Sequence, residues 1–177
     1  MKTLYLVFLP LIKFWYVHWS NAVQFFEKYF LKTKEVPGAI TPPGKSNCCS
    51  FWEEFCENEC LIHSPDTWRV LWDAISLPGR VLERKTGDCD DYARLSYEVF
   101  GPVISYCGRD YTFDGLKALL YGDMSRNHVI AVWNSTDSSL VVSNGHMYHT
   151  KDWLKSWKEG LLATFSISIN EKGKLIC

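Results

Sequence analysis

The stretch "RKTGDCDDYARL" (residues 84–95) contains one cysteine, Cys89, surrounded by aspartates at positions 88, 90 and 91. A cysteine attacks as its thiolate, and a negative charge close by disfavours that form by raising the thiol pKa. The acidic neighbours therefore oppose the chemistry that the thiol could perform. Either other groups compensate for them, or the carboxylates themselves form a site for a hard cation such as Mg²⁺ or Ca²⁺.

The cation hypothesis fits the sequence less well. An EF-hand loop needs a glycine and a terminal glutamate at fixed spacing, and "DCDDYARLSYE" (88–98) lacks that pattern. No apolar strand leads into the cluster either. We therefore expect no metal and no other cofactor to be required here.

A second metal hypothesis is zinc bound by Cys49, Cys56, Cys60 and His63. Cys56 and Cys60 lie one helical turn apart, so both thiols could reach one ion. The segment has no CxxC pair and no second histidine at zinc-finger spacing, so buried or unreactive thiols are the favoured interpretation. The chain has seven cysteines, and this odd number fits a complete disulfide framework poorly and favours a reducing compartment.

The residues after Gly87 have the pattern of a helix N-terminus. Asp88 suits the N-cap, Cys89 then becomes the first helical residue, and Gly101 followed by proline ends the helix. Aspartates in a first turn interact favourably with the helix dipole, and the amides at a helix start favour a thiolate. Gly87 lets another group approach the sulfur closely. We expect the pKa of Cys89 to lie below the free value of about 8.5.

A nucleophilic cysteine also needs a base and a group that orients this base. Of the five histidines, His128 opens a clear apolar strand, "HVIAVW" (128–133). Residues 134–138, "NSTDS", are turn formers, and "SLVVSNG" (139–145) has the pattern of a return strand. The two segments therefore predict an antiparallel hairpin with His128 at its open end.

The register of this hairpin decides which residue faces the histidine. With a five-residue loop, Trp133 pairs with Ser139, and His128 lies opposite Asn144. Directly opposed side chains have Cβ atoms about 4.5–5.5 Å apart, close enough for an amide oxygen to hold an imidazole N–H. This register predicts a site made of Cys89, His128 and Asn144. A shift by one residue would remove Asn144 from it.

Two other features lie close to this hairpin. His146 and His149 flank the predicted turn, where they either shape a substrate site or belong to a solvated loop. Asp152 is a rival for the third position, but "TKDWLKSW" (150–157) favours a short helix with Asp152 in its first turn.

Three features together resemble the transglutaminase-like cysteine peptidase superfamily, and its bacterial and phage transglutaminase-like cysteine proteinases in particular. They are "GDCDDYA" (87–93), the histidine of "NHVIAVW", and a polar residue 16 positions further on in "VVSNG". "PDTWRVLWDAISLP" (65–78) resembles the helical lead-in of that family, so the resemblance covers about half of the chain. It implies Cys89 as nucleophile, His128 as base and Asn144 as orienting residue. The family often has aspartate in the third place, and asparagine lacks the charge that would stabilise an imidazolium.

The resemblance implies a papain-like α+β fold, with the nucleophile helix packed on an antiparallel sheet and extra helices at the N-terminus. It also implies acyl transfer from a protein, peptide or cell-wall amide through a thioester on Cys89. Water would then give hydrolysis, and an amine would give transamidation. The backbone N–H of Cys89 is the expected oxyanion donor. An inactive module that binds peptide or glycan is the alternative.

The remaining elements must hold these groups in place. The chain has 177 residues, of which 47% are hydrophobic and 15% aromatic, enough for a sizeable core. We divide it into an apolar helix with a Pro/Gly-rich linker (1–47) and a catalytic domain (48–177). The pattern predicts helices over 11–31, 50–60 and 64–76, the last ended by Pro78-Gly79, and strands over 127–134, 139–145 and 161–169.

The N-terminus and the net charge bear on location and partners. Residues 4–19 are strongly apolar, but Pro10 and Lys13 interrupt them, and a membrane-spanning helix needs about 20 apolar residues. A helix packed on the domain is favoured over a signal peptide or anchor, so we expect a cytoplasmic protein, with membrane association through 4–19 or secretion as alternatives. The net charge of −1, without a basic stripe, does not suggest nucleic-acid binding. The oligomeric state is not predicted.

Overall fold

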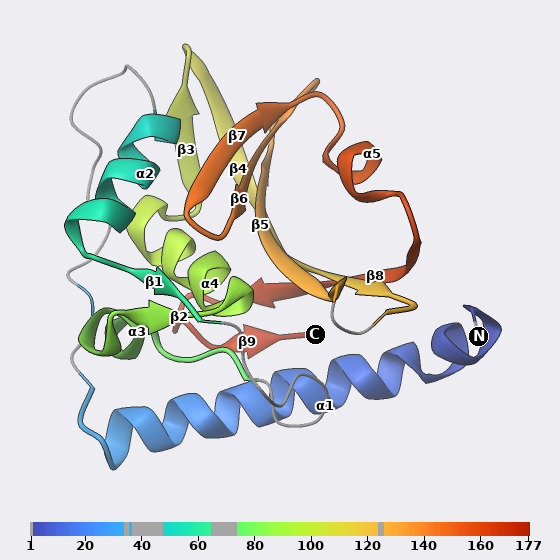
Figure 1. Cartoon of the computed structure of the whole chain (residues 1–177), viewed down its shortest axis with the longest axis horizontal. Helices are drawn as coiled ribbons and strands as arrows, with labels where there is room; N and C mark the ends of the chain where they lie inside the picture. The colour runs from blue at the N-terminus through green and yellow to red at the C-terminus, as the bar shows by residue number, and fades with distance from the viewer. Residues whose placement is uncertain (1, 34–35, 37–47, 65–73, 124–125) are drawn as a thin grey trace.

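The computed structural model of the chain describes residues 2–33, 36, 48–64, 74–123 and 126–177 (Figure 1). Within these residues, helices surround a mostly antiparallel sheet. The predicted α+β class is therefore confirmed.

The N-terminal helix α1 (Lys2–Tyr29) runs along one side of the molecule, beneath the C-terminal strands in Figure 1. It starts well before the predicted position, and Pro10 lies inside it. Val17 is buried in the main hydrophobic core, which confirms the prediction that this helix packs on the rest of the chain.

Two short helices precede the cysteine. The predicted helix at 50–60 is confirmed as α2 (Cys48–Asn58), where Trp52 is fully buried. Residues 74–77 are not helical, so the helix predicted at 64–76 does not extend to Pro78-Gly79, and Pro78 instead begins the helix α3 (Pro78–Arg84). Proline lacks a backbone N–H and has a helical φ, so it suits a first helical position. Most of the helix predicted at 64–76 falls on 65–73, outside the described residues.

A small parallel ladder lies directly before the cysteine. Strand β1 (Ile62–His63) pairs with β2 (Thr86–Gly87), with His63 opposite Gly87. The helix α4 (Cys89–Phe100) follows at once and confirms the prediction for this segment. Asp88 occupies the N-cap position with an extended backbone, although its side chain makes no capping hydrogen bond.

The large sheet has the order β7-β6-β5-β4-β8-β9, and β3 pairs with the first part of β4. All these pairs are antiparallel. The strand β8 lies at the predicted position, whereas the central strand β4 was not predicted. The strands are β3 (Val103–Tyr106), β4 (Arg109–Tyr121), β5 (His128–Asn134), β6 (Ser139–Ser143), β7 (His146–Thr150), β8 (Leu161–Ile169) and β9 (Leu175–Ile176).

Strand β5 is buried on both faces. Val129, Ala131 and Trp133 join the core that α4 and α2 cover. Ile130 and Val132 join a second, smaller core beside the short helix α5 (Trp153–Trp157). This two-sided burial explains why the segment is a nearly continuous apolar run.

The hairpin of β5 and β6 has a different register from the predicted one. Trp133 pairs with Leu140 rather than with Ser139, because Asn134 remains in the strand and pairs with Ser139 itself. The side chain of Asn134 donates to Asp114 over 2.9 Å and accepts from Ser139 over 2.6 Å. These contacts shorten the loop by one residue. The predicted pairing of His128 with Asn144 is therefore wrong.

His146 and His149 lie on β7, not beside a free loop. His149 Nε2 is 3.1 Å from the hydroxyl of Tyr111, and His146 Nδ1 is 3.2 Å from a carboxylate oxygen of Glu53. Asp152 stands at the N-cap of α5, where it accepts from the backbone of Lys155. All three side chains thus have structural contacts.

Candidate active site

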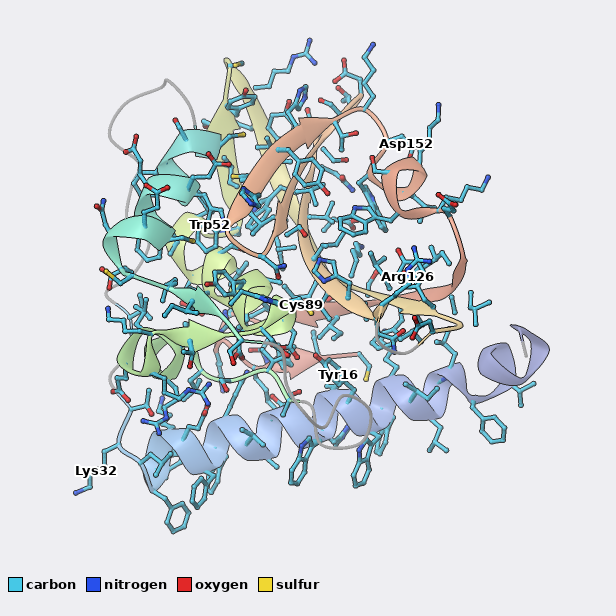
Figure 2. All side chains as sticks on the ribbon, viewed as in Figure 1. Tyr16, Lys32, Trp52, Cys89, Arg126 and Asp152 are labelled. Carbon is cyan, nitrogen blue, oxygen red and sulfur yellow. The ribbon has the colours of Figure 1, made fainter. Side chains whose placement is uncertain are left out.

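The thiol of Cys89 lies at the start of α4, where this helix meets the sheet (Figure 2). The backbone N–H of Val129 on β5 donates a hydrogen bond to Sγ of Cys89 over 3.3 Å. Cys89 is half-buried, so the sulfur is partly shielded from water. Val129 directly follows His128 on β5, so the thiol contacts the strand that carries the predicted base.

The ring of His128 is held from the neighbouring strand. Its Nε2 lies 2.8 Å from Oγ of Ser143, the last residue of β6. Nδ1 makes no hydrogen bond within the part of the chain that the structure describes. This ring nitrogen is thus the one available to exchange a proton with a thiol or a substrate.

Trp157 lies over the ring of His128. The ring centroids are 5.1 Å apart and the planes are inclined by 30°. Trp157 is itself fixed, because its Nε1 donates to the hydroxyl of Tyr148 over 3.0 Å and its carbonyl accepts from Tyr121 over 2.9 Å. Sequence reasoning missed this residue, although the helix that carries it was predicted.

His128 is neutral at neutral pH. Burial and, to a smaller extent, the charge of His63 lower its pKa to about 4, while Asp88 acts in the opposite direction. A neutral imidazole can accept a proton, so the ring is in the form that a general base requires. His63 is exposed on β1, and its charge acts on the ring of His128.

The aspartates beside Cys89 have structural partners, which answers the question that their charges raise. Asp90 accepts a hydrogen bond from the hydroxyl of Tyr16 on α1. Asp91 accepts from the backbone N–H of Ser76 over 2.8 Å and lies 3.5 Å from the guanidinium of Arg84. Burial and the charge of Asp88 raise the pKa of Asp91 to about 7. The negative charge around the thiol is therefore smaller than three aspartates suggest.

Gly87 has a structural reason that differs from the expected one. A Cβ at this position would lie 2.9 Å from Cβ of Asp91 and 3.1 Å from a methyl group of Val81. Gly87 thus allows α3 and α4 to pack closely against β2. The expected role, access of another group to the sulfur of Cys89, is not what requires glycine here.

Asn144 is not hydrogen-bonded to His128. It lies in the turn between β6 and β7 with φ +53°, a conformation that asparagine tolerates. Its backbone carbonyl accepts from Trp52 Nε1 over 2.9 Å, and its Oδ1 is buried without a hydrogen bond among the described residues. The hairpin register differs by one residue from the predicted one, and the side chain that contacts His128 is that of Ser143.

Within the described residues, one group has the proximity that a metal ion requires: Asp88, Asp90 and Asp91, whose ligand atoms lie within 4.8 Å of one another. Tyr16, Ser76 and Arg84 already contact two of these carboxylates. The four residues of the zinc hypothesis form no such group there. Burial raises the pKa of Cys56, the second of the four, to about 12, which disfavours the thiolate that zinc binds.

Comparisons of this chain with family models, curated proteins and solved structures found no match. In the described residues, no helix combines the length and apolar character needed to cross a membrane.

Proposed function

We propose that the protein is a cysteine-dependent amide hydrolase or acyl transferase with a papain-like, transglutaminase-like arrangement. The observation that supports this proposal is the hydrogen bond from Val129 to Cys89, which holds the thiol at the start of α4 against the strand that begins with His128. Helix amides and a neighbouring neutral imidazole are the surroundings that activate a cysteine.

The reaction proceeds in two stages. The thiol proton of Cys89 passes to Nδ1 of His128, and the sulfur forms a bond to the carbonyl carbon of the substrate amide. The C–N bond then breaks, and the leaving amine takes the proton from His128, which leaves a thioester on Cys89. Water or an amine attacks the thioester, gives its proton to His128 and releases the thiol, which regains that proton.

The developing oxyanion is stabilised by the backbone N–H of Cys89. This amide belongs to the first turn of α4, whose N–H groups have no acceptor within the helix itself. Gln24, the chain's one glutamine, does not serve as second donor, because its amide donates to the backbone carbonyl of Ile75.

A second candidate function is an inactive module that binds peptides or glycans in the same place. The uncharged hydroxyl of Ser143 is the partner of His128, and the lowered pKa of the ring makes an imidazolium costly. Both observations favour weak chemistry, since no carboxylate of the described residues is hydrogen-bonded to the ring.

Trapping the thioester decides between the two functions. The protein is incubated with a library of protein and cell-wall amides, quenched in acid, and its intact mass and peptides are measured. The enzyme hypothesis predicts an acyl adduct on Cys89 that hydroxylamine releases, and no adduct with Cys89→Ser. Ligand binding by both proteins without any adduct would instead establish the binding module.

A further inference from the structure

The C-terminal part of the helix α1, from Ser20 to Glu27, is amphipathic in the inverted sense, because its polar side chains face the domain. Ser20, Gln24 and Glu27 are all buried, and Glu27 is only 5% exposed. Figure 2 shows Tyr16 on the same inward side and ring side chains projecting from the opposite side of the helix. A helix held to its domain by hydrophobic contacts alone would have the reverse arrangement.

Directed hydrogen bonds fix this orientation. Ser20 Oγ accepts from the backbone N–H of Ile75 over 3.1 Å, and Gln24 donates to the carbonyl of the same residue over 3.0 Å. Glu27 accepts from the N–H of Leu77 over 2.7 Å. Rotation of α1 about its axis would break these buried bonds, so the helix cannot turn its rings inward at low cost.

The opposite side of α1 is apolar from Leu11 to Tyr29. We call it the outer face and define it by six side chains, each between 48% and 63% exposed: Leu11, Phe14, Trp15, Phe25, Phe26 and Tyr29. At 3.6 residues per turn these six fall within an arc of about 120°. Rings four residues apart lie against one another, as Phe25 and Tyr29 do at 4.6 Å between centroids.

The charges on this part of the chain have one sign. Residues 2–33 contain four lysines and one carboxylate, Glu27, which is buried. The whole chain has a net charge of −1, so the remainder is net negative. An anionic surface therefore attracts the α1 side and repels the other sides of the molecule.

We propose that the outer face of α1 docks in the plane of an anionic lipid membrane. The helix is about 42 Å long at 1.5 Å per residue and forms one side of the molecule, so its whole length can lie on a flat surface (Figure 1). Tryptophan and tyrosine suit the interfacial layer, and lysines bind anionic headgroups. The catalytic proposal is independent of this one.

A second copy of the chain suits the face less well than a membrane. In a two-fold dimer the same surface meets itself, which would bring the lysines of two α1 helices together without any exposed carboxylate of these helices to pair with. A spanning orientation is also disfavoured, because the inner side of α1 is bonded to the domain.

Co-sedimentation with vesicles tests the proposal. The wild-type chain should pellet with mixed vesicles of phosphatidylcholine and phosphatidylserine, and much less with phosphatidylcholine alone. Phe25→Gln with Tyr29→Gln should weaken binding to mixed vesicles about tenfold or more, because two exposed rings no longer partition. Lys28→Gln with Lys32→Gln should weaken it about tenfold without changing binding to neutral vesicles.

The matched control is Val103→Gln with Leu154→Gln, which removes exposed apolar side chains outside α1 and should bind like the wild type. Cys89→Ser should also bind normally, which separates this result from failure of the catalytic proposal. Wild-type-like binding by Phe25→Gln with Tyr29→Gln overturns the proposal. The proposal is also overturned if the wild type binds no vesicles but forms a dimer, and if this dimer dissociates in Phe25→Gln with Tyr29→Gln.

Discussion

Oγ of Ser143 lies 2.8 Å from Nε2 of His128, across the hairpin of β5 and β6. A hydroxyl can accept an N–H from the ring and so fix which nitrogen carries the proton, but it cannot neutralise an imidazolium. Ser143 therefore supplies orientation without charge, which is the role that the sequence assigned to Asn144.

Substitutions at the two positions should separate them. Ser143→Ala should slow alkylation of Cys89 by iodoacetamide about fivefold, because one hydrogen bond is worth about 1 kcal/mol. Asn144→Ala should slow it less, since its side-chain oxygen has no bond to lose. Ser143→Asp should accelerate alkylation, because a carboxylate favours the protonated ring. A larger loss in Asn144→Ala than in Ser143→Ala would restore the predicted triad.

His63 should depress the pKa of His128 measurably. Its charge is the second cause of the low pKa of His128, after burial. In His63→Gln, an NMR titration of the His128 ring should therefore give a higher pKa than in the wild type. His18→Gln is the control, because His18 lies on the outer side of α1 and should leave the titration unchanged. An unchanged value in His63→Gln would mean that burial alone sets the pKa.

The parts of the fold that follow local rules were predictable. The helix α4 begins after Asp88 and ends before Gly101, because capping residue, first-turn carboxylates and terminal glycine all agree. Strand β8 has its predicted bounds, since its apolar residues stand between turn formers. The pairing of Cys89 with His128 rests on the order of these elements and on the family resemblance, and it stays a prediction.

The remainder depends on contacts between distant segments. The central strand β4 contains "LKALL" (116–120), which favours a helix locally, and it becomes a strand through pairing with β5 and β8. The hairpin register depends on the bonds of Asn134 to Asp114 and Ser139. Trp157 reaches His128 because α5 folds back over the sheet, and no local pattern encodes this contact.

His128 should make stability depend on pH in a defined window. Its pKa is about 4 in the folded chain, against 6.5 for an unperturbed ring, so the unfolded state binds more protons between these values. This contribution is complete above pH 6.5 and is lost as pH falls towards 4, by about 3 kcal/mol. The difference in free energy of unfolding between the wild type and His128→Asn should therefore fall by that amount as the pH is lowered from 6.5 to 4.

Comparison with the variant is necessary because Asp91 acts oppositely. Its pKa is raised to about 7, so its contribution to stability is present at low pH and is lost as pH rises through the same window. Urea unfolding of both proteins at several pH values isolates the effect of His128. A constant difference between the two proteins from pH 7.5 to 4 would contradict the neutral, buried ring.

Gly87→Ala should destabilise the fold beside the thiol. The new methyl group would meet Asp91 and Val81 at 2.9 and 3.1 Å, and overpacking of this kind costs about 1–3 kcal/mol. Gly145→Ala is the matched control, because nothing lies within 4 Å of its added methyl group. The two free energies of unfolding should differ accordingly, and equal values would show that α4 moves without cost.

The reactivity of Cys89 tests the whole site. At pH 6.5, iodoacetamide should label Cys89 before the exposed Cys60, Cys107 and Cys177, because the N–H groups at the start of α4 favour its thiolate. Cys56 serves as an internal reference, since burial raises its pKa to about 12 and it should not react. Peptide mapping after short reaction times locates the adducts.

His128→Ala should slow labelling of Cys89 about tenfold or more, because the thiol loses its general base. In a complete catalytic reaction, a general base typically contributes about 10²–10⁴-fold. The rates at Cys107 and Cys60 should not change, because both lie on other surfaces and report only intrinsic thiol chemistry. Faster labelling of Cys107 than of Cys89 in the wild type would sink the catalytic hypothesis. So would an unchanged Cys89 rate in His128→Ala, since the hydrogen bond from Val129 would then hold an ordinary thiol at the start of a helix.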